Sequence, residues 1–304
     1  MSKTSIKTYD TESFRKKYMT SQQQLDALLK TDYGKFFIVK VEDMLRLMKL
    51  PIPPTRATGH TLIYLTEGEA IMTIGSETYK IFKDECLVVP AGQVFSFSNF
   101  DINKGYLCNF HNDVIIGKFG KNDLLKDFEF LRVWGNPRIT LDPLASEFAL
   151  PLFQRLFIEY SANGLKNSDI ILSYFIALLC ELNRVYKPVF HSSQSRAVNI
   201  TYRFKEALFS EIKIKHLVTD YASLLHITPN HLNKSVKAIT GKSPTDWIDE
   251  AIILEAKVLL YQSSYSIQEV AMEVGFADPS YFSRFFKKKE GVTPVQFQRM
   301  IEKS

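Results

Sequence analysis

The feature that most constrains the fold of this chain is an internal repeat in its last third. The segments 218–247 and 267–297 match each other, with an offset of 49 residues before a central turn and 50 residues after it. In each copy a helix-forming stretch precedes the turn, and a second stretch begins at a proline and ends at a glycine. Proline suits the first position of a helix, and glycine suits the position just past its end. The matched pairs are Ala222 and Ala271, Pro229 and Pro279, Gly241 and Gly291, and Pro244 and Pro294.

The repeat predicts two helix-turn-helix units, at about 214–240 and 266–290, in an all-α domain over residues 200–304. The second helix of each unit has two distinct faces. One is apolar and is expected to anchor the helix to its own unit. The other carries hydrogen-bond donors and positive charge at the spacing i, i+3, i+4, i+7. The apolar faces are Leu232, Val236 and Ile239 in the first unit, and Phe282, Phe285 and Phe286 in the second.

The polar faces of these two helices fit the major groove of double-stranded DNA. Arg284 can present two donors to guanine O6 and N7, and Asn230 or Asn233 can bridge N6 and N7 of adenine. The run Lys287–Lys289 lies toward the helix end, where phosphate contact is expected, and His231 is expected to contact a phosphate as well. The predicted DNA-binding residues are Asn230, His231, Asn233, Lys234, Lys237, Ser280, Tyr281, Ser283, Arg284, Lys287 and Lys288.

Between the two copies, the stretch Pro244–Gln262 has apolar residues at helical intervals. As one helix it would span about 28 Å at roughly 1.5 Å per residue. Because the major groove of DNA recurs every ~34 Å, a rigid connecting helix of this length can hold two recognition helices in successive grooves.

The stretch "EVGFADPSYFSRFFKKKEGVTP" resembles the signature of the AraC/XylS family of bacterial transcription regulators at nearly every position. The first copy, "HITPNHLNKSVKAITGKSP", keeps the Pro, Leu and Gly framework and departs at Ser235-Val236, where the family commonly has an aromatic. The resemblance implies promoter DNA and RNA polymerase as partners, with activation the commoner outcome. It also implies an N-terminal effector-binding domain of cupin-like form, a helical dimerisation segment, and hence a homodimer that responds to a small-molecule effector.

The N-terminal part fits that expectation in its pattern. From Thr31 to Phe119 the residues alternate and turns recur, which predicts short antiparallel strands in a barrel or sandwich. The expected fold class is α+β, and the resemblance implies that residues 1–140 form a cupin-like β-barrel. His60 stands alone, and Gln93 follows the Pro90–Gly92 turn where an enzymatic cupin has histidine, so no metal and no cofactor is expected. Candidate effector-binding residues are Arg56, His60 and Tyr64, although a surface arginine and a histidine satisfied in the core are the alternatives.

Residues 141–187 read as two amphipathic helices, followed by a linker at 188–199. An apolar stripe on the second helix either completes the core of the barrel or forms a dimer interface. Dimerisation is favoured, since paired protomers match paired DNA sites. The stripe comprises Leu172, Phe175, Ile176, Leu179 and Leu182.

Composition narrows the class of protein. The net charge of +5 permits a polyanionic partner without requiring one. The three cysteines have no metal-binding spacing, which favours a reducing cytoplasm, and no apolar run reaches the roughly 20 residues that a membrane helix needs. We therefore expect a non-enzymatic DNA-binding regulator. Two alternatives are a cupin enzyme with an appended DNA-binding module and a regulator whose N-terminal domain is only a dimerisation or interaction platform.

Overall fold

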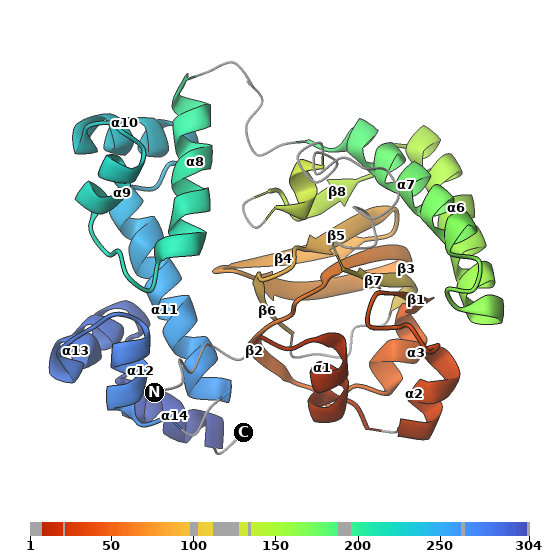
Figure 1. Ribbon diagram of the computed structural model, residues 1–304, viewed down its shortest axis with the longest axis horizontal. Helices are drawn as coiled ribbons and strands as arrows, with labels where there is room; N and C mark the ends of the chain where they lie inside the picture. The colour runs from red at the N-terminus through yellow and green to blue at the C-terminus, as the bar shows by residue number, and fades with distance from the viewer. Residues whose placement is uncertain are drawn as a thin grey trace. The chain divides into compact units, whose positions relative to one another are not determined.

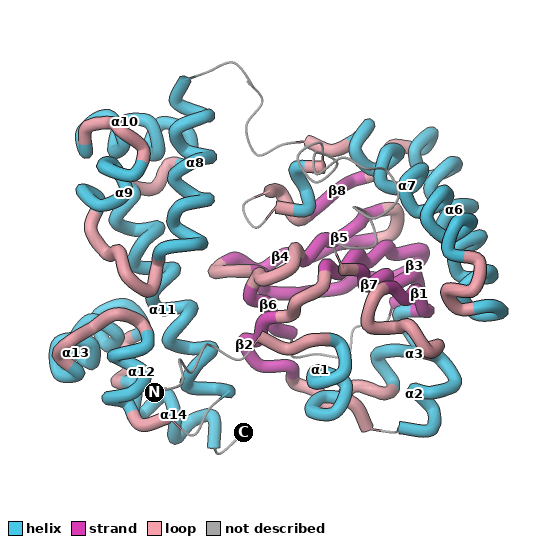
Figure 2. Tube along the Cα trace, viewed as in Figure 1, coloured by secondary structure: helices cyan, strands magenta, loops and turns pink. Residues whose placement is uncertain are grey.

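The computed structural model describes residues 8–20, 22–97, 103–111, 128–132, 135–187, 196–262 and 265–302. Contacts between Cα atoms divide the chain into an N-terminal unit, which ends at residue 189, and a C-terminal unit, which starts at residue 190. The first unit combines a large sheet with helices, and the described residues of the second unit are helices and their connections (Figures 1 and 2). The α+β class is thereby confirmed.

The described strands of the N-terminal unit all pair in antiparallel fashion, as the alternating pattern predicts. Its main path runs β1-β7-β3-β5-β8, while β4 pairs with β3, and β6 pairs with both β2 and β3. The long strand β3 joins two parts of the sheet, because its first half lies between β7 and β5 and its second half pairs with β4. The strands are β1 (Phe36–Lys40), β2 (Ile52–Arg56), β3 (His60–Ile74), β4 (Glu77–Phe82), β5 (Glu85–Val89), β6 (Val94–Phe97), β7 (Asn103–Phe110) and β8 (Arg138–Thr140).

Alternation along β3 separates two apolar cores on the two faces of the sheet. Leu62 and Tyr64 belong to one core, and Ile63 and Leu65 belong to the other, as a period of two residues requires. Helices α6 (Pro143–Asn163) and α7 (Ser168–Val185) cover the first face (Figure 1). Tyr64 stacks on Phe153 of α6, with 4.8 Å between the ring centroids.

The apolar stripe of α7 completes this core. Phe175, Leu179 and Leu182 are fully buried in it, and Leu172 and Ile176 are partly buried. The preference for a dimer interface on this stripe was wrong, because residues that are already buried against the sheet cannot meet a second protomer. The alternative, completion of the core, is what the structure contains.

The described part of the N-terminal unit also contains three short helices and one 3-10 turn. Helix α1 begins after Asp10, whose carboxylate accepts a hydrogen bond from the Ser13 backbone N–H at 2.7 Å. An ion pair between Arg15 and Asp26 joins α1 to the chain around α2. These elements are α1 (Thr11–Tyr18), α2 (Gln22–Leu28), α3 (Val41–Arg46) and the turn η1 (Glu129–Leu131).

In the C-terminal unit, six of the seven described helices form two similar modules on either side of the seventh, the long helix α11 (Figure 1). Helix α8 starts at Arg196, so the last four residues of the predicted linker are helical, and residues 188–195 lie outside the described part of the chain. The connecting helix has the predicted bounds. The helices are α8 (Arg196–Glu211), α9 (Val218–Leu224), α10 (Pro229–Thr240), α11 (Pro244–Gln262), α12 (Ile267–Glu273), α13 (Pro279–Glu290) and α14 (Pro294–Glu302).

Candidate DNA-binding surface

Helices α10 and α13 are built by the same local signals. The Thr228 hydroxyl caps α10 by accepting from the His231 N–H at 3.2 Å, and the Asp278 carboxylate caps α13 by accepting from the Ser280 N–H at 2.8 Å. Both helices end at a glycine in the left-handed region, Gly241 with φ of 73° and Gly291 with φ of 78°. This conformation is accessible to glycine at little cost, so each recognition helix has a defined length.

The apolar face of each helix is buried within its own module. Leu232 and Val236 of α10 are fully buried, as are Phe282 and Phe286 of α13. Around α13 the rings form a continuous aromatic cluster, in which Phe282 and Phe286 lie 5.8 Å apart and Phe286 lies 5.6 Å from Phe297 of α14. The phenylalanines of this basic helix therefore serve as its anchor, as the repeat predicts.

The opposite face of each helix remains accessible. Most predicted DNA-binding positions are exposed, and those that are only partly exposed are His231, Asn233 and Ser283. Asn233 donates from Nδ2 to the Pro229 carbonyl at 3.0 Å, and Ser283 donates from Oγ to the Pro279 carbonyl at 2.9 Å. The exposed positions are Asn230, Lys234, Lys237, Ser280, Tyr281, Arg284, Lys287 and Lys288.

Lys289 differs from the two lysines that precede it. Its Nζ lies 2.6 Å from Oδ2 of Asp249 on helix α11, and the two side chains are 33% and 20% exposed. The sequence suggested a phosphate contact for the whole run, but in the structure Lys289 is engaged in an ion pair within the domain. Sequence spacing gave no signal for this pair, because the two residues are 40 positions apart.

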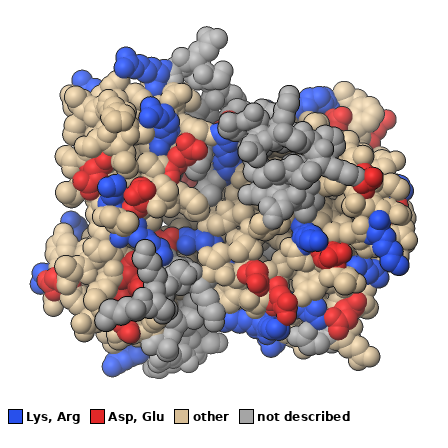
Figure 3. All heavy atoms as spheres, viewed as in Figure 1, with Lys and Arg blue, Asp and Glu red and all other residues tan. Residues whose placement is uncertain are grey.

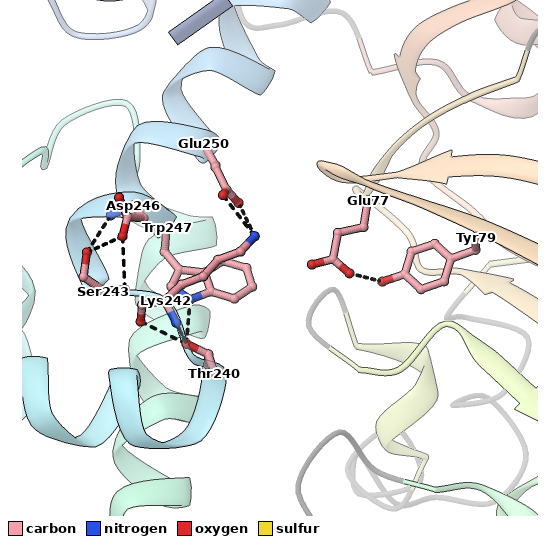
Figure 4. A network of polar contacts seen from close by, with 8 residues as sticks. All are labelled: Glu77, Tyr79, Thr240, Lys242, Ser243, Asp246, Trp247 and Glu250. Carbon is pink, nitrogen blue, oxygen red and sulfur yellow. Dashed lines mark hydrogen bonds and ion pairs between the residues drawn. The ribbon is translucent and has the colours of Figure 1, made fainter.

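The connecting helix α11 carries a second group of contacts that sequence reasoning missed, drawn in Figure 4. The Trp247 indole N–H donates to the Thr240 hydroxyl at 3.1 Å, and Lys242 Nζ lies 3.0 Å from a carboxylate oxygen of Glu250. Lys205 of α8 lies over the Trp247 ring, 4.0 Å from its centroid. These contacts fix the end of α10 and the start of α11 relative to each other.

On the visible face of this unit, positive charge is local rather than continuous. On the face drawn in Figure 3, Lys and Arg side chains are interspersed with Asp and Glu over the C-terminal unit.

The candidate effector residues occupy three different environments. His60 is buried, accepts from the Ala91 N–H at Nδ1 over 3.1 Å, and stacks on Phe110, which matches the alternative of a histidine satisfied in the core. Tyr64 is buried under α6 and donates to Asp84 at 3.0 Å. Arg56 is partly exposed at the end of β2.

A cavity of about 120 Å³ lies on the other side of the sheet from Tyr64, and none of the three candidates is among its described lining residues. Its walls come from α1, α3 and the strands β1, β3, β5, β6 and β7, and they are mostly apolar. Asn103 also lines it. The Asn103 Nδ2 donates to the Glu69 carbonyl at 2.9 Å, whereas the Oδ1 is buried and accepts no hydrogen bond from the residues that the structure describes.

The described residues were also compared with the requirements of a metal site and of a membrane-spanning helix. No three His, Cys, Asp or Glu side chains there come together in a way that could hold a metal ion. Within the same ranges, no helix is both long enough and apolar enough to cross a membrane.

Two repeated modules with capped recognition helices define the class of this protein, a helix-turn-helix DNA-binding protein. A model of a helix-turn-helix domain matches residues 221–300. This domain and the similarity to regulators of the AraC/XylS type support an AraC-family transcription regulator.

The chain is similar to several regulators over different lengths. It is 26% identical over 157 residues to the uncharacterized HTH-type transcriptional regulator YisR of Bacillus subtilis, covering 52% of this chain and 53% of that protein. It is 23% identical over 250 residues to the MmsAB operon regulatory protein of Pseudomonas aeruginosa, covering 81% and 77% of the two chains. The chain thus spans about half the length of YisR, one of the curated relatives that it matches.

A solved structure, the C-terminal domain of AraT, a response regulator from Geobacillus stearothermophilus, is 29% identical with a TM-score of 0.33. That comparison covers 35% of this chain and 88% of the other.

Proposed function

We propose that the protein is a sequence-specific regulator of transcription whose helices α10 and α13 enter two successive major grooves of promoter DNA. The observation that carries this proposal is the repeated pair of capped helices, each with a buried apolar face and an exposed polar face. The 19-residue helix α11 between them has a length close to the groove repeat, at roughly 1.5 Å per residue against ~34 Å per turn of DNA.

Within this arrangement we assign base readout to the first turns of each helix and phosphate contact to the last turns. Arg284 is exposed on the polar face of α13 and carries the paired donors that guanine O6 and N7 accept. Asn230 at the start of α10 is the corresponding candidate for adenine. Lys237 and Lys288 lie near the helix ends, where a long flexible cation reaches the backbone and carries no sequence information.

The function also includes a response to a small molecule bound in the N-terminal unit. The cavity supports this part, because its walls are mostly apolar and the Asn103 Oδ1 has no donor among the described residues. An apolar cavity of roughly 150 Å³ is known to take benzene, so a volume near 120 Å³ suits one small ring or a short chain. We assign an apolar ligand with one hydrogen-bond donor. A closed cupin-like barrel is the form of the sheet that suits such a site.

The regulator is proposed to act as a homodimer that activates transcription through RNA polymerase. The apolar surface available for pairing lies on the outer face of α6, where Leu144, Phe148 and Ile158 are at least half exposed and recur at helical spacing. This face replaces the α7 stripe as the proposed dimer interface. Without an effector response, the N-terminal unit would be a platform for pairing alone.

Selection from randomised duplex DNA with the full-length protein, at a stated salt concentration, tests the proposal directly. The expected product is a recurring site with two informative blocks about ten base pairs apart. A single short block would contradict reading by two helices, and the absence of any enrichment, with and without candidate effectors, would contradict sequence-specific binding.

A further inference from the structure

We infer that Asp249 and Glu250, neighbours on the connecting helix α11, are positioning residues that fix the spacing of the two recognition helices. Each carboxylate pairs with a lysine at the end of a different recognition helix. This inference rests on the proposed function for its consequence in DNA binding, whereas the coupling itself is a property of the free protein.

Asp249 ties the second module to the connecting helix. Its partner Lys289 lies in the last turn of α13, at 2.6 Å. The next residue, Glu290, returns a second ion pair to Lys257 of α11 at 2.5 Å, and all four side chains are one-third exposed or less. In one pair α13 supplies the lysine, and in the other it supplies the carboxylate. Two ion pairs between the same two helices resist rotation of α13 about its own axis better than one pair would.

Glu250 ties the first module to the same part of α11. Lys242 follows the glycine that ends α10, and its Nζ lies 3.0 and 3.2 Å from the two carboxylate oxygens of Glu250. Lys242 also lies over the ring of Trp247, 5.2 Å from the centroid (Figure 4). Consecutive residues on a helix point about 100° apart, so Asp249 and Glu250 can reach opposite modules from one turn.

A direct contact between the modules completes the coupling. The connection between α8 and α9 approaches the turn after α12, where the Lys213 carbonyl and the His216 ring stand next to Gly275. The His216 ring also packs on Phe276, with 5.2 Å between the centroids. The two recognition helices are therefore held at three places, and α11 carries two of them.

A rigid pair of recognition helices discriminates between DNA sites by their spacing. If the two half-sites are moved apart by one base pair, one helix loses its contacts or the DNA must deform, which costs free energy. A pair of modules that can shift relative to each other tolerates the change. Loss of either carboxylate is thus expected to relax spacing discrimination without weakening a single module's contacts.

The coupling is measured first without DNA, by electron–electron distance measurements on the full-length protein. Spin labels are placed at Lys237→Cys and Lys288→Cys, which are exposed, and the exposed Cys180 is replaced by Ser. The labelled protein in which Asp249 and Glu250 are both intact should give one narrow distribution of distances between the labels. Asp249→Asn together with Glu250→Gln should broaden it, whereas Glu206→Gln, an exposed carboxylate of α8, should not. A width unchanged in the double variant overturns the inference.

The consequence is measured on the site recovered by selection and on copies of it with the spacing changed by one base pair in each direction. Asp249→Asn should lower the affinity ratio between correct and altered spacing by up to about fivefold, which corresponds to the most that one exposed ion pair contributes. Glu206→Gln should leave the ratio unchanged. A uniform gain in affinity at all spacings would overturn the inference, because it would make the released Lys289 a phosphate ligand. If selection yields no two-block site, the proposed function fails, and the label distances still decide the coupling. Thermal melting of each variant verifies that it is folded.

Discussion

Gly275 lies against the imidazole of His216 so closely that a Cβ on residue 275 would stand 2.7 Å from the ring Cε1 and 2.6 Å from the Lys213 carbonyl. Gly275 belongs to the second module and His216 to the connection that leads into the first. Burial lowers the pKa of His216, which favours the neutral form of the ring. The contact is possible only because residue 275 has no side chain.

Gly275→Ala is therefore expected to destabilise the C-terminal unit more than an ordinary glycine substitution. Gly241→Ala is the matched control, because its φ of 73° is also positive but nothing lies within 4 Å of the added Cβ. The control should lose about 1 kcal/mol of unfolding free energy from backbone strain alone. Gly275→Ala should lose about 1–3 kcal/mol more from overpacking. Denaturant unfolding measures both, and equal losses would show that the close approach to His216 has no energetic weight.

Arg284→Ala is expected to reduce affinity for the selected site by about 1–3 kcal/mol and to relax the preference at one base pair. The reason is that two guanine acceptors lose their paired donors. Affinities for a panel of DNA sites that differ from the selected site at one base pair measure both effects. A uniform loss across the panel would reassign Arg284 to a phosphate.

Lys288→Ala should weaken binding to all DNA sequences alike, because we expect an exposed lysine at the helix end to contact only the phosphate backbone of the DNA. The slope of log affinity against log salt should become shallower by about one unit. Lys289→Ala is the informative comparison, since that lysine is held by Asp249. A larger change of slope for Lys289 than for Lys288 would contradict the assignment of the two side chains.

The ligand assignment predicts that Asn103 distinguishes phenol from toluene, two molecules of similar shape of which only phenol has a hydrogen-bond donor. Asn103→Leu should weaken phenol binding relative to toluene by about tenfold, the worth of one hydrogen bond to an otherwise unsatisfied acceptor. Thr61→Val is the control within the cavity lining, because the Thr61 hydroxyl already accepts from Asn109 at 3.1 Å. Calorimetry or a thermal shift measures the binding. If the ratio of phenol affinity to toluene affinity is the same in Asn103→Leu and Thr61→Val, Asn103 does not bind the donor of the ligand.

Dimerisation through α6 predicts that one charge on its outer face separates the protomers. Phe148→Glu places a carboxylate on an exposed position of the apolar surface, where burial against a second copy would be costly. Sedimentation should then change from dimer to monomer. The control is Gln268→Glu, which adds the same charge at an exposed position of α12 in the C-terminal unit. An unchanged dimer in the Phe148 variant would place the interface elsewhere.

The C-terminal unit was predictable to a large extent because its signals are local. Thr228, Asp278 and the two glycines that end α10 and α13 act within a few residues of their own position, so a sequence repeat reports them directly. The division of each recognition helix into an apolar and a polar face likewise needs only the helical period.

The same local reasoning could not choose between two uses of an apolar stripe. Phe175 and Leu179 have the spacing of an interface and equally that of a core, and only their burial under the sheet decided between them. The candidate effector residues were chosen for their chemistry. The cavity, however, is enclosed by elements from residue 10 to residue 109, and no pattern within one segment describes such a space.

The sequence by itself therefore determined the two modules, the length of the connecting helix and the residues on the exposed faces, since each depends on neighbours along the chain. The tertiary structure decided that Lys289 belongs to Asp249, that His216 meets Gly275, and that Asn103 borders the cavity with an unused oxygen. The physical reason is the same in each case. Ion pairs, close contacts and unsatisfied acceptors depend on distances across space, and residues far apart in sequence come within a few ångströms only when the chain has folded.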